Sequence, residues 1–118
     1  MKVKRGEIWT CDLNPTQGGE INNGAKGNPR TVLVISHDIL NNQSNTVLVL
    51  PITQGIHHRS DEGENLLVNL QGTGTETQGV IVPTQARTVS KQRLKKRVES
   101  VPGYAVEEAV EKFIATFQ

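Results

Sequence analysis

The sequence predicts a mainly β protein, in which a small, strongly curved antiparallel sheet or partly open barrel is closed by a C-terminal helix. Three observations lead to this fold class. Short runs rich in β-branched residues recur between residues 6 and 89, polar and glycine-rich segments separate them, and the final segment has the period of a helix. The 118 residues contain no repeat or linker, so a single domain spanning residues 1–118 is expected.

The first strand is expected at residues 6–13, GEIWTCDL, where alternation places Trp9 and Cys11 on one face. Two near-continuous runs of valine, leucine and isoleucine follow, at residues 31–36 and 46–51. Runs of this kind are typical of central strands that are buried on both faces. The segment between them, HDILNNQSN, is polar and is expected to form a turn.

The sheet is expected to continue through residues 65–70, 79–83 and 86–89, with the glycine-rich segment QGTGTETQG as a hairpin-type connection. The basic run SKQRLKKR is expected to form a short helix that Ser90 caps. A longer helix ends the chain, because apolar residues recur there with helical spacing, at Val106, Ala109, Val110, Phe113, Ile114 and Phe117.

Composition excludes several classes of protein. The net charge of +1 and the sequence pI of about 7.9 argue against a strongly basic, non-specific nucleic-acid binder but allow a local positive groove. Aromatic residues make up 3% of the chain, too few for a base-stacking platform. Cys11 is the one cysteine, so neither an intramolecular disulfide nor a cysteine-based zinc site can form. The sequence predicts no signal peptide and no membrane span, and a cytoplasmic protein is expected.

A long polar connection precedes the second strand. Connections longer than about 12–15 residues without structure of their own are uncommon and are usually functional or disordered. This one contains Glu20 and ends at Arg30, at the entrance to a central strand. A guanidinium held there by a rigid sheet is suited to gripping a phosphate through two hydrogen bonds. The alternative is a surface arginine paired with Glu20 or Asp38, which contributes at most about 1 kcal/mol to stability.

Other candidate residues carry weaker signals. Thr53 follows the third apolar run and can offer a hydroxyl to a phosphate, although the segment PITQG also fits an ordinary turn. His57 and His58 can serve acid–base chemistry, but they point to opposite faces of an extended loop, which argues against joint metal ligation. Cys11 is expected to be a core residue rather than a nucleophile. The basic residues of 91–97 are expected to lie on a solvated face.

These segments, taken in order, match a known family. RGEIWTCDLNPTQGGE, an arginine before VLVIS, LPITQG, GVIVPTQARTVS, KRVESVP and a final amphipathic helix together resemble the MazF/PemK/Kid family. The resemblance covers nearly the whole chain, and its most specific parts are the N-terminal motif and the Q.RT segment that begins at Gln85. Members of this family are the toxin components of bacterial toxin–antitoxin pairs.

The resemblance implies a fold, an activity and partners. The fold is an SH3-like barrel of the MazF–Kid–CcdB type, with a C-terminal helix that helps to build a homodimer. The activity is sequence-specific cleavage of single-stranded RNA without a metal or cofactor. The 2′-hydroxyl attacks the neighbouring phosphate and leaves a 2′,3′-cyclic phosphate and a 5′-hydroxyl, and cleavage of mRNA inhibits translation. The partner is an antitoxin whose disordered C-terminal tail folds across the RNA groove.

The resemblance also assigns site residues. Arg30, Thr53 and Glu20 match catalytic positions. Arg30 is suited to the charge of the phosphorane and Thr53 to orienting the phosphate, while Glu20 is the expected base, with His37 or His57 as alternatives. The residues expected to contact RNA are Gln54, His57, His58, Arg59, Gln85 and Arg87.

The chain departs from Kid-like members at catalytic positions. Those members have a histidine before the loop glutamate, where this chain has Gly19, and an arginine and an aspartate where it has Val82 and Thr84. Chemistry through Arg30 and Thr53 is the route that is left. The departures leave open a non-catalytic module that binds RNA or a partner. A gyrase poison like CcdB fits less well, because the chain ends in IATFQ instead of Trp-Gly-Ile.

Overall fold

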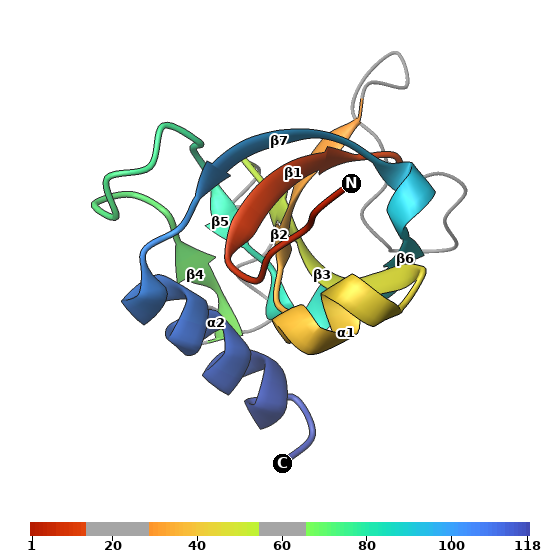
Figure 1. Cartoon of the computed structure of the whole chain (residues 1–118). Coiled ribbons are helices and arrows are strands. Elements are labelled where there is room, and N and C mark those ends of the chain that lie inside the picture. The colour runs from red at the N-terminus through yellow and green to blue at the C-terminus, as the bar shows by residue number, and fades with distance from the viewer. Residues whose placement is uncertain (14–28, 55–65) are drawn as a thin grey trace.

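The computed structural model describes residues 1–13, 29–54 and 66–118. Within these residues the elements are β1 (Glu7–Cys11), β2 (Arg30–Val34), α1 (Asp38–Gln43), β3 (Thr46–Thr53), β4 (Val68–Asn69), β5 (Val80–Ile81), β6 (Arg87–Ser90), β7 (Leu94–Ser100) and α2 (Gly103–Ala115). Two 3-10 turns, Pro83–Gln85 and Lys91–Arg93, flank β6. The prediction of a mainly β fold with a C-terminal helix is confirmed (Figure 1).

The strands form one antiparallel sheet in the order β4–β5–β3–β2–β1–β7, and β6 pairs with β3 beside that path. Strand β3 pairs with β6 over residues 46–49, with β2 over 49–51 and with β5 over 52–53. Strands β1 and β7 arch together over one side of the molecule (Figure 1), and two register shifts interrupt their pairing. Such irregularities bend a strand and increase its twist. They allow this short sheet to curve toward a barrel.

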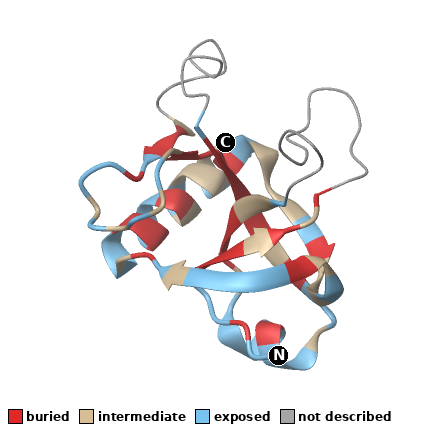
Figure 2. Cartoon of the chain, turned by 90° about the horizontal axis from the view of Figure 1, so that it is seen from above, coloured by how far each residue is buried: buried red, intermediate tan, exposed pale blue. Residues whose placement is uncertain are grey.

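Two hydrophobic clusters lie on the two faces of the central strands. The barrel cluster gathers residues of β1, β2, β3, β6 and β7, including Trp9, Cys11, Val32, Val34, Val49 and Leu94. The helix cluster packs alternate residues of the same central strands against α2 and includes Ile8, Leu33, Leu50, Ile52, Val106 and Ala109. Figure 2 shows these buried residues in the centre of the sheet and on one side of the helices. The expectation that the central strands are buried on both faces is confirmed.

Two predictions of local structure were wrong. The segment expected as a polar turn contains helix α1, because the ring Nδ1 of His37 accepts a hydrogen bond from the backbone N–H of Ile39 at the helix start. The side chain of Asn41 is buried in the same helix and donates to the carbonyl of Ser36 at 2.8 Å. The helix expected at residues 90–97 is a single 3-10 turn that Ser90 caps, and strand β7 follows it.

Three other elements are shorter or less covered than expected. Regular pairing in the 65–70 and 79–83 segments is limited to the two residues of β4 and the two of β5. Helix α2 buries Val106 and Ala109, as its apolar period predicts, and Ala105 in addition. The end of the same apolar face is uncovered, since Ile114 is 49% and Phe117 76% exposed.

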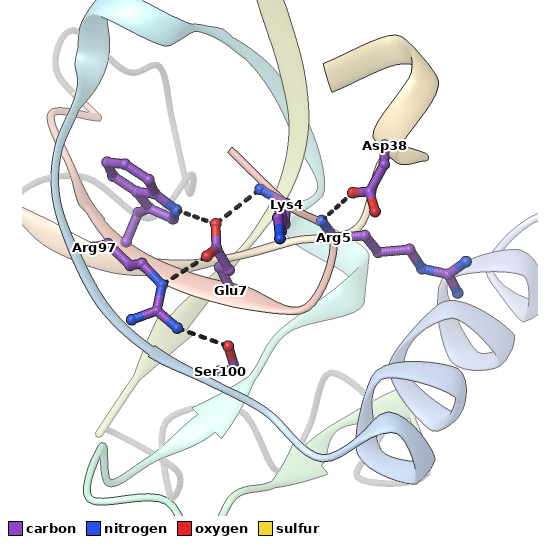
Figure 3. A network of polar contacts seen from close by, with 7 residues as sticks. Lys4, Arg5, Glu7, Asp38, Arg97 and Ser100 are labelled. Carbon is purple, nitrogen blue, oxygen red and sulfur yellow. Dashed lines mark hydrogen bonds and ion pairs between the residues drawn. The ribbon is translucent and has the colours of Figure 1, made fainter. Parts of the chain in front are cut away.

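The carboxylate of Glu7 joins the N-terminal turn to β1 and β7 (Figure 3). Its Oε1 accepts hydrogen bonds from the backbone N–H of Lys4 at 2.7 Å and from the indole Nε1 of Trp9 at 3.1 Å, and its Oε2 accepts one from Nε of Arg97 at 2.6 Å. Burial raises the pKa of the Glu7 carboxyl, but these hydrogen bonds and the charge of Arg97 outweigh burial, and the pKa lies below its ordinary value. The RGEIW motif therefore contains a buried ionised acid.

Gly79 approaches the end of β3 more closely than any other residue type could. Its φ of +118° is one that side-chain-bearing residues rarely adopt, and a Cβ added to it would lie 2.5 Å from the carbonyl oxygen of Thr53. Any larger residue at this position would therefore have to displace the backbone at Thr53.

We expect Gly79→Ala to lower the free energy of unfolding by about 2–4 kcal/mol, because it combines backbone strain with a clash against Thr53. Thermal or denaturant unfolding measures the loss. Gly72→Ala is the matched control, since Gly72 has a φ of +84° but no atom within 4 Å of its added Cβ. Equal losses in the two variants would show that the approach to Thr53 carries no cost.

We expect Glu7→Gln to destabilise the protein by about 1–2 kcal/mol at pH 7, because the charge-assisted bond to Arg97 is lost. The folded-state pKa of Glu7 is lowered, so its stabilisation is full above the ordinary pKa of 4.5 and disappears as the pH falls through the lower folded value. Denaturant unfolding across this pH range should show wild type and variant converging in acid. Glu111→Gln, on the exposed side of α2, should not change stability; a pH-independent gap between wild type and Glu7→Gln would contradict the assignment.

Candidate functional site

The pairing of β2 with β3 brings two predicted catalytic residues together. Arg30 is the first residue of β2, and Thr53 is the last residue of β3. Val32 with Pro51 is the last pair of this ladder, and Arg30 and Thr53 each lie two residues beyond it, at the same end of the two strands. Two residues that are 23 positions apart in the sequence are thus brought to one edge of the molecule by two neighbouring strands.

A hollow of about 460 Å³ opens at this end of the two strands. It is lined by Pro29, Arg30, Thr31, Ile52, Gln54, Glu76, Thr77 and Gln78. Its volume lies within the range of roughly 300–1,000 Å³ that is usual for ligand sites. The lining combines a guanidinium, two side-chain amides that can both donate and accept, and one carboxylate that accepts. Such a set suits a ligand that carries both a phosphate and hydrogen-bonding edges.

The catalytic candidates differ in accessibility. Arg30 is half-buried, Thr53 is 9% exposed and Gln54 is exposed. Thr53 pairs with Val80, so its backbone is held from the side of β5. The side chains of Arg30 and Gln54 line the hollow, whereas Thr53 is not among its lining residues.

Gln85 and Arg87 lie away from the residues that line this hollow. Gln85 ends a 3-10 turn and is half-buried. Arg87 is in β6, and its Nη1 donates to the carbonyl of Leu13 at 3.0 Å, while Nη1 of Arg93 donates to the carbonyl of Asp12 at 3.2 Å. The arginine of the Q.RT segment thus holds the chain directly after β1, a contact that the sequence did not predict. RNA contact by either Gln85 or Arg87 stays a prediction.

Several predicted site residues lie outside the described part of the chain: Gly19, Glu20, His57, His58 and Arg59. Two alternatives can be placed. His37 caps α1, beyond the end of β2 opposite to Arg30, so it does not lie where a base for this site is needed. Asp38, the alternative partner of Arg30, starts the same helix, and its carboxylate accepts the backbone N–H of Arg5 at 2.7 Å (Figure 3).

The departures from the Kid-like pattern have a structural counterpart at residues 82 and 84. Val82 is fully buried in the barrel cluster, and its backbone N–H donates to the carbonyl of Pro51 at 2.9 Å. Thr84 is exposed. A charged side chain buried at residue 82 would need a partner to offset its desolvation, so in this chain the position serves packing.

Cys11 is fully buried in the barrel cluster, as predicted. Burial raises the pKa of its thiol to about 11, despite the opposing charges of Arg87 and Arg93. The thiol is therefore protonated at neutral pH and is no nucleophile. Across residues 1–13, 29–54 and 66–118, no three His, Cys, Asp or Glu side chains gather where they could hold a metal ion. In the same residues no helix is long and apolar enough to span a membrane.

The lining residues 76–78 and their support from Glu99 were missed by sequence reasoning. The segment QGTGTETQG was interpreted only as a connection, and β7, which carries Glu99, was expected to be partly helical. Glu99 lies 22 residues beyond Thr77, so no local pattern links the two. The polar residues Glu76 and Gln78, placed just before a buried strand, were the available signal.

Comparison with known proteins shows the family. Residues 4–117 match the model of the PemK-like, MazF-like toxins of type II toxin–antitoxin systems. The chain is 37% identical over 98 residues to endoribonuclease EndoA of Bacillus subtilis (strain 168), covering 83% of this chain and 79% of the relative, and 36% identical over 101 residues to endoribonuclease PemK of Escherichia coli, covering 85% and 71%.

Solved structures agree on the fold. MazF of Deinococcus radiodurans superposes with a TM-score of 0.82 at 18% identity, over 99% of this chain and 97% of that one. An endoribonuclease in complex with its cognate antitoxin, from a mycobacterial species, superposes with a TM-score of 0.74 at 15% identity, over 98% and 94%. The expected MazF-type fold is thereby confirmed. On the match over residues 4–117 and on identities above 35% to two endoribonucleases, this chain belongs to the PemK-like, MazF-like toxins of type II toxin–antitoxin systems.

Proposed function

We propose that this toxin is a sequence-specific endoribonuclease that cleaves single-stranded mRNA in the cytoplasm, without a metal ion, and so inhibits translation. The observation that supports the proposal is the pairing of β2 with β3, which leaves Arg30 and Thr53 at the same end of the two strands, where Arg30 and Gln54 line a polar hollow. The names of the curated relatives, endoribonucleases EndoA and PemK, supply the class of reaction. They favour a cleaving toxin over the non-catalytic binding module and over a gyrase poison.

In the proposed reaction the 2′-oxygen forms a bond to phosphorus while the bond from phosphorus to the 5′-oxygen breaks. The products are a 2′,3′-cyclic phosphate and a 5′-hydroxyl, whose oxygen takes up a proton from solvent as it leaves. Extra negative charge develops on the phosphoryl oxygens between these events, and a guanidinium held at the end of a rigid strand can stabilise it. We assign this role to Arg30 and the orientation of the phosphate to Thr53.

The proton of the 2′-hydroxyl needs an acceptor. Arg30 cannot accept it, because a guanidinium has N–H donors but no acceptor. We assign the base to Glu20, which belongs to the family motif and lies outside the described residues. His57, which also lies outside the described residues, is the alternative candidate for the base. A carboxylate that is desolvated when RNA binds has its pKa raised toward neutrality, which suits it to this task.

We further propose that a cognate antitoxin inhibits the enzyme by laying a disordered C-terminal tail across the RNA groove. A homologous fold has been solved with its cognate antitoxin bound. A tail that becomes ordered on binding can cover an extended surface. The polar hollow beside Arg30 and Gln54 would then be occupied by either RNA or tail.

We also propose a homodimer, to which the uncovered end of α2 contributes. Ile114 and Phe117 are exposed there, and the ring of Phe117 stacks edge-on against that of Phe113 with centroids 5.3 Å apart. Apolar side chains grouped in this way are typical of a surface that another chain covers.

We expect Arg30→Ala to reduce cleavage by about 10²–10³-fold while leaving the fold intact, because a preorganised charge-stabilising donor is removed. The measurement is a digestion of long single-stranded RNA in EDTA, with the fragment ends identified by mass spectrometry. Arg5→Ala is the matched control, since it removes the same charge from an exposed residue of the N-terminal turn. Unchanged cleavage in Arg30→Ala, or loss of cleavage only through unfolding, would refute the assignment.

We expect antitoxin and RNA to exclude one another. The test is to titrate a toxin–antitoxin complex with a fluorescent, 2′-O-methylated RNA, which cannot be cut. The RNA should either displace the tail or fail to bind. A stable ternary complex with undiminished RNA affinity would show that the tail does not cover the RNA groove.

A further inference from the structure

The connection between β4 and β5 is held rigidly by its own threonines. The hydroxyl of Thr73 donates to the carbonyl of Leu70 at 2.6 Å and lies 3.0 Å from the hydroxyl of Thr75. The hydroxyl of Thr75 donates to the carbonyl of Thr77 at 3.1 Å. The hydroxyls of Thr73 and Thr75 are thus hydrogen-bonded within the connection, although glycines adjoin them. The side chains of Glu76 and Gln78, which lie between and beyond these threonines, are exposed.

Glu99 of β7 binds the same connection from outside. Its Oε1 accepts the backbone N–H of Glu76 at 3.1 Å, and its Oε2 accepts the backbone N–H of Thr77 at 2.7 Å together with the Thr77 hydroxyl. These hydrogen bonds, the one from the Thr77 hydroxyl first, lower the pKa of the Glu99 carboxyl and keep it ionised. In Figure 1 the connection extends beside the end of β7. The backbone at residues 76 and 77 is therefore fixed to a second strand.

Glu76 and Gln78 line the hollow that Arg30 and Gln54 also line. Their chemistry complements that of the arginine. A carboxylate repels a phosphate but accepts hydrogen bonds from an exocyclic amino group, and an amide can both donate to and accept from the edge of a base. Groups that read a base edge must be held in place before the ligand arrives, and this connection meets that requirement.

We propose that Glu76 and Gln78, together with Gln54, form the subsite that reads one nucleobase next to the phosphate bound by Arg30, and that this base carries an exocyclic amino group. Glu99 is the positioning residue of the subsite. The inference rests on the proposed function, whose substrate it specifies in more detail.

The test is to digest an RNA pool of random sequence and to sequence the ends that carry a 5′-hydroxyl. Wild type should prefer an amino-bearing base at one position of its motif. Glu76→Gln and Gln78→Ala should each reduce that preference by about tenfold relative to cleavage at the other motifs in the pool. Glu99→Gln should relax the same position and speed amide hydrogen exchange at residues 76 and 77. Glu111→Gln, which makes the same charge change on the exposed side of α2, should leave the motif unchanged.

An unchanged motif in both Glu76→Gln and Gln78→Ala would overturn the inference. A loss of rate by Glu76→Gln with the motif intact would also overturn it and would place Glu76 in the chemistry instead. Faster amide exchange in Glu99→Gln without a change in motif would reduce Glu99 to a purely structural residue and refute its assigned role.

Binding distinguishes failure of the inference from failure of the proposed function. Selection of a 2′-O-methylated random pool by wild type and by Glu76→Gln reports base preference without any cutting. If wild type does not cleave but shows a preference that Glu76→Gln removes, the inference holds and the nuclease proposal fails. If wild type cleaves but selects no sequence, the inference alone is overturned, and if it neither cleaves nor selects a sequence, both are overturned.

Discussion

Strand β3 pairs with more strands than any other described strand does, and the arrangement of the sheet follows from that constraint. Its backbone pairs with β6, β2 and β5 in turn, while its side chains enter the barrel cluster on one face and the helix cluster on the other. Buried backbone groups need partners, so the three neighbouring strands can each occupy only one stretch of β3. Its last two residues pair with β5, directly after the stretch that pairs with β2. Thr53 lies at that end, so its position is set by the packing and pairing of β3 in the core.

Two ionised glutamates secure the parts of the chain that sheet pairing does not reach. Glu7 accepts from the N-terminal turn, from the indole of Trp9 and from β7, and Glu99 accepts from the connection between β4 and β5. In both, hydrogen bonds hold the pKa below its ordinary value, so the carboxylates accept at full strength at neutral pH. An arching strand at the edge of the sheet thereby connects the N-terminus to the wall of the hollow.

The sequence was sufficient for the fold class because the central strands and α2 have strong periods, and long periodic segments override local ambiguity. The sequence did not predict α1, because its N-cap is a histidine rather than the usual Ser, Thr, Asp or Asn. It did not predict the start of β7, because Leu94 is the one buried residue of that strand and the charged residues after it hide any alternation. Arg30 and Thr53 were found through the family motif, whereas their proximity required the register of two strands. Glu99 could not be found at all, since its partners are 22 and 23 residues distant.

The burial of Val82 bears on how a member of this family can work without the Kid-type catalytic set. A positioned acid or base contributes about 10²–10⁴-fold to a rate, and one charge-stabilising donor about 10²–10³-fold. These ranges overlap, so the proposed site of Arg30 and a single carboxylate base would supply a substantial share of the acceleration. Val82 meanwhile adds a fully buried side chain to the barrel cluster, to which the strand that begins at Arg30 contributes Val32 and Val34. Where Kid-like members have a charged group, this chain thus has a packing residue, and a rigid support suits an electrostatic catalyst, because its donor must not reorganise as the charge develops.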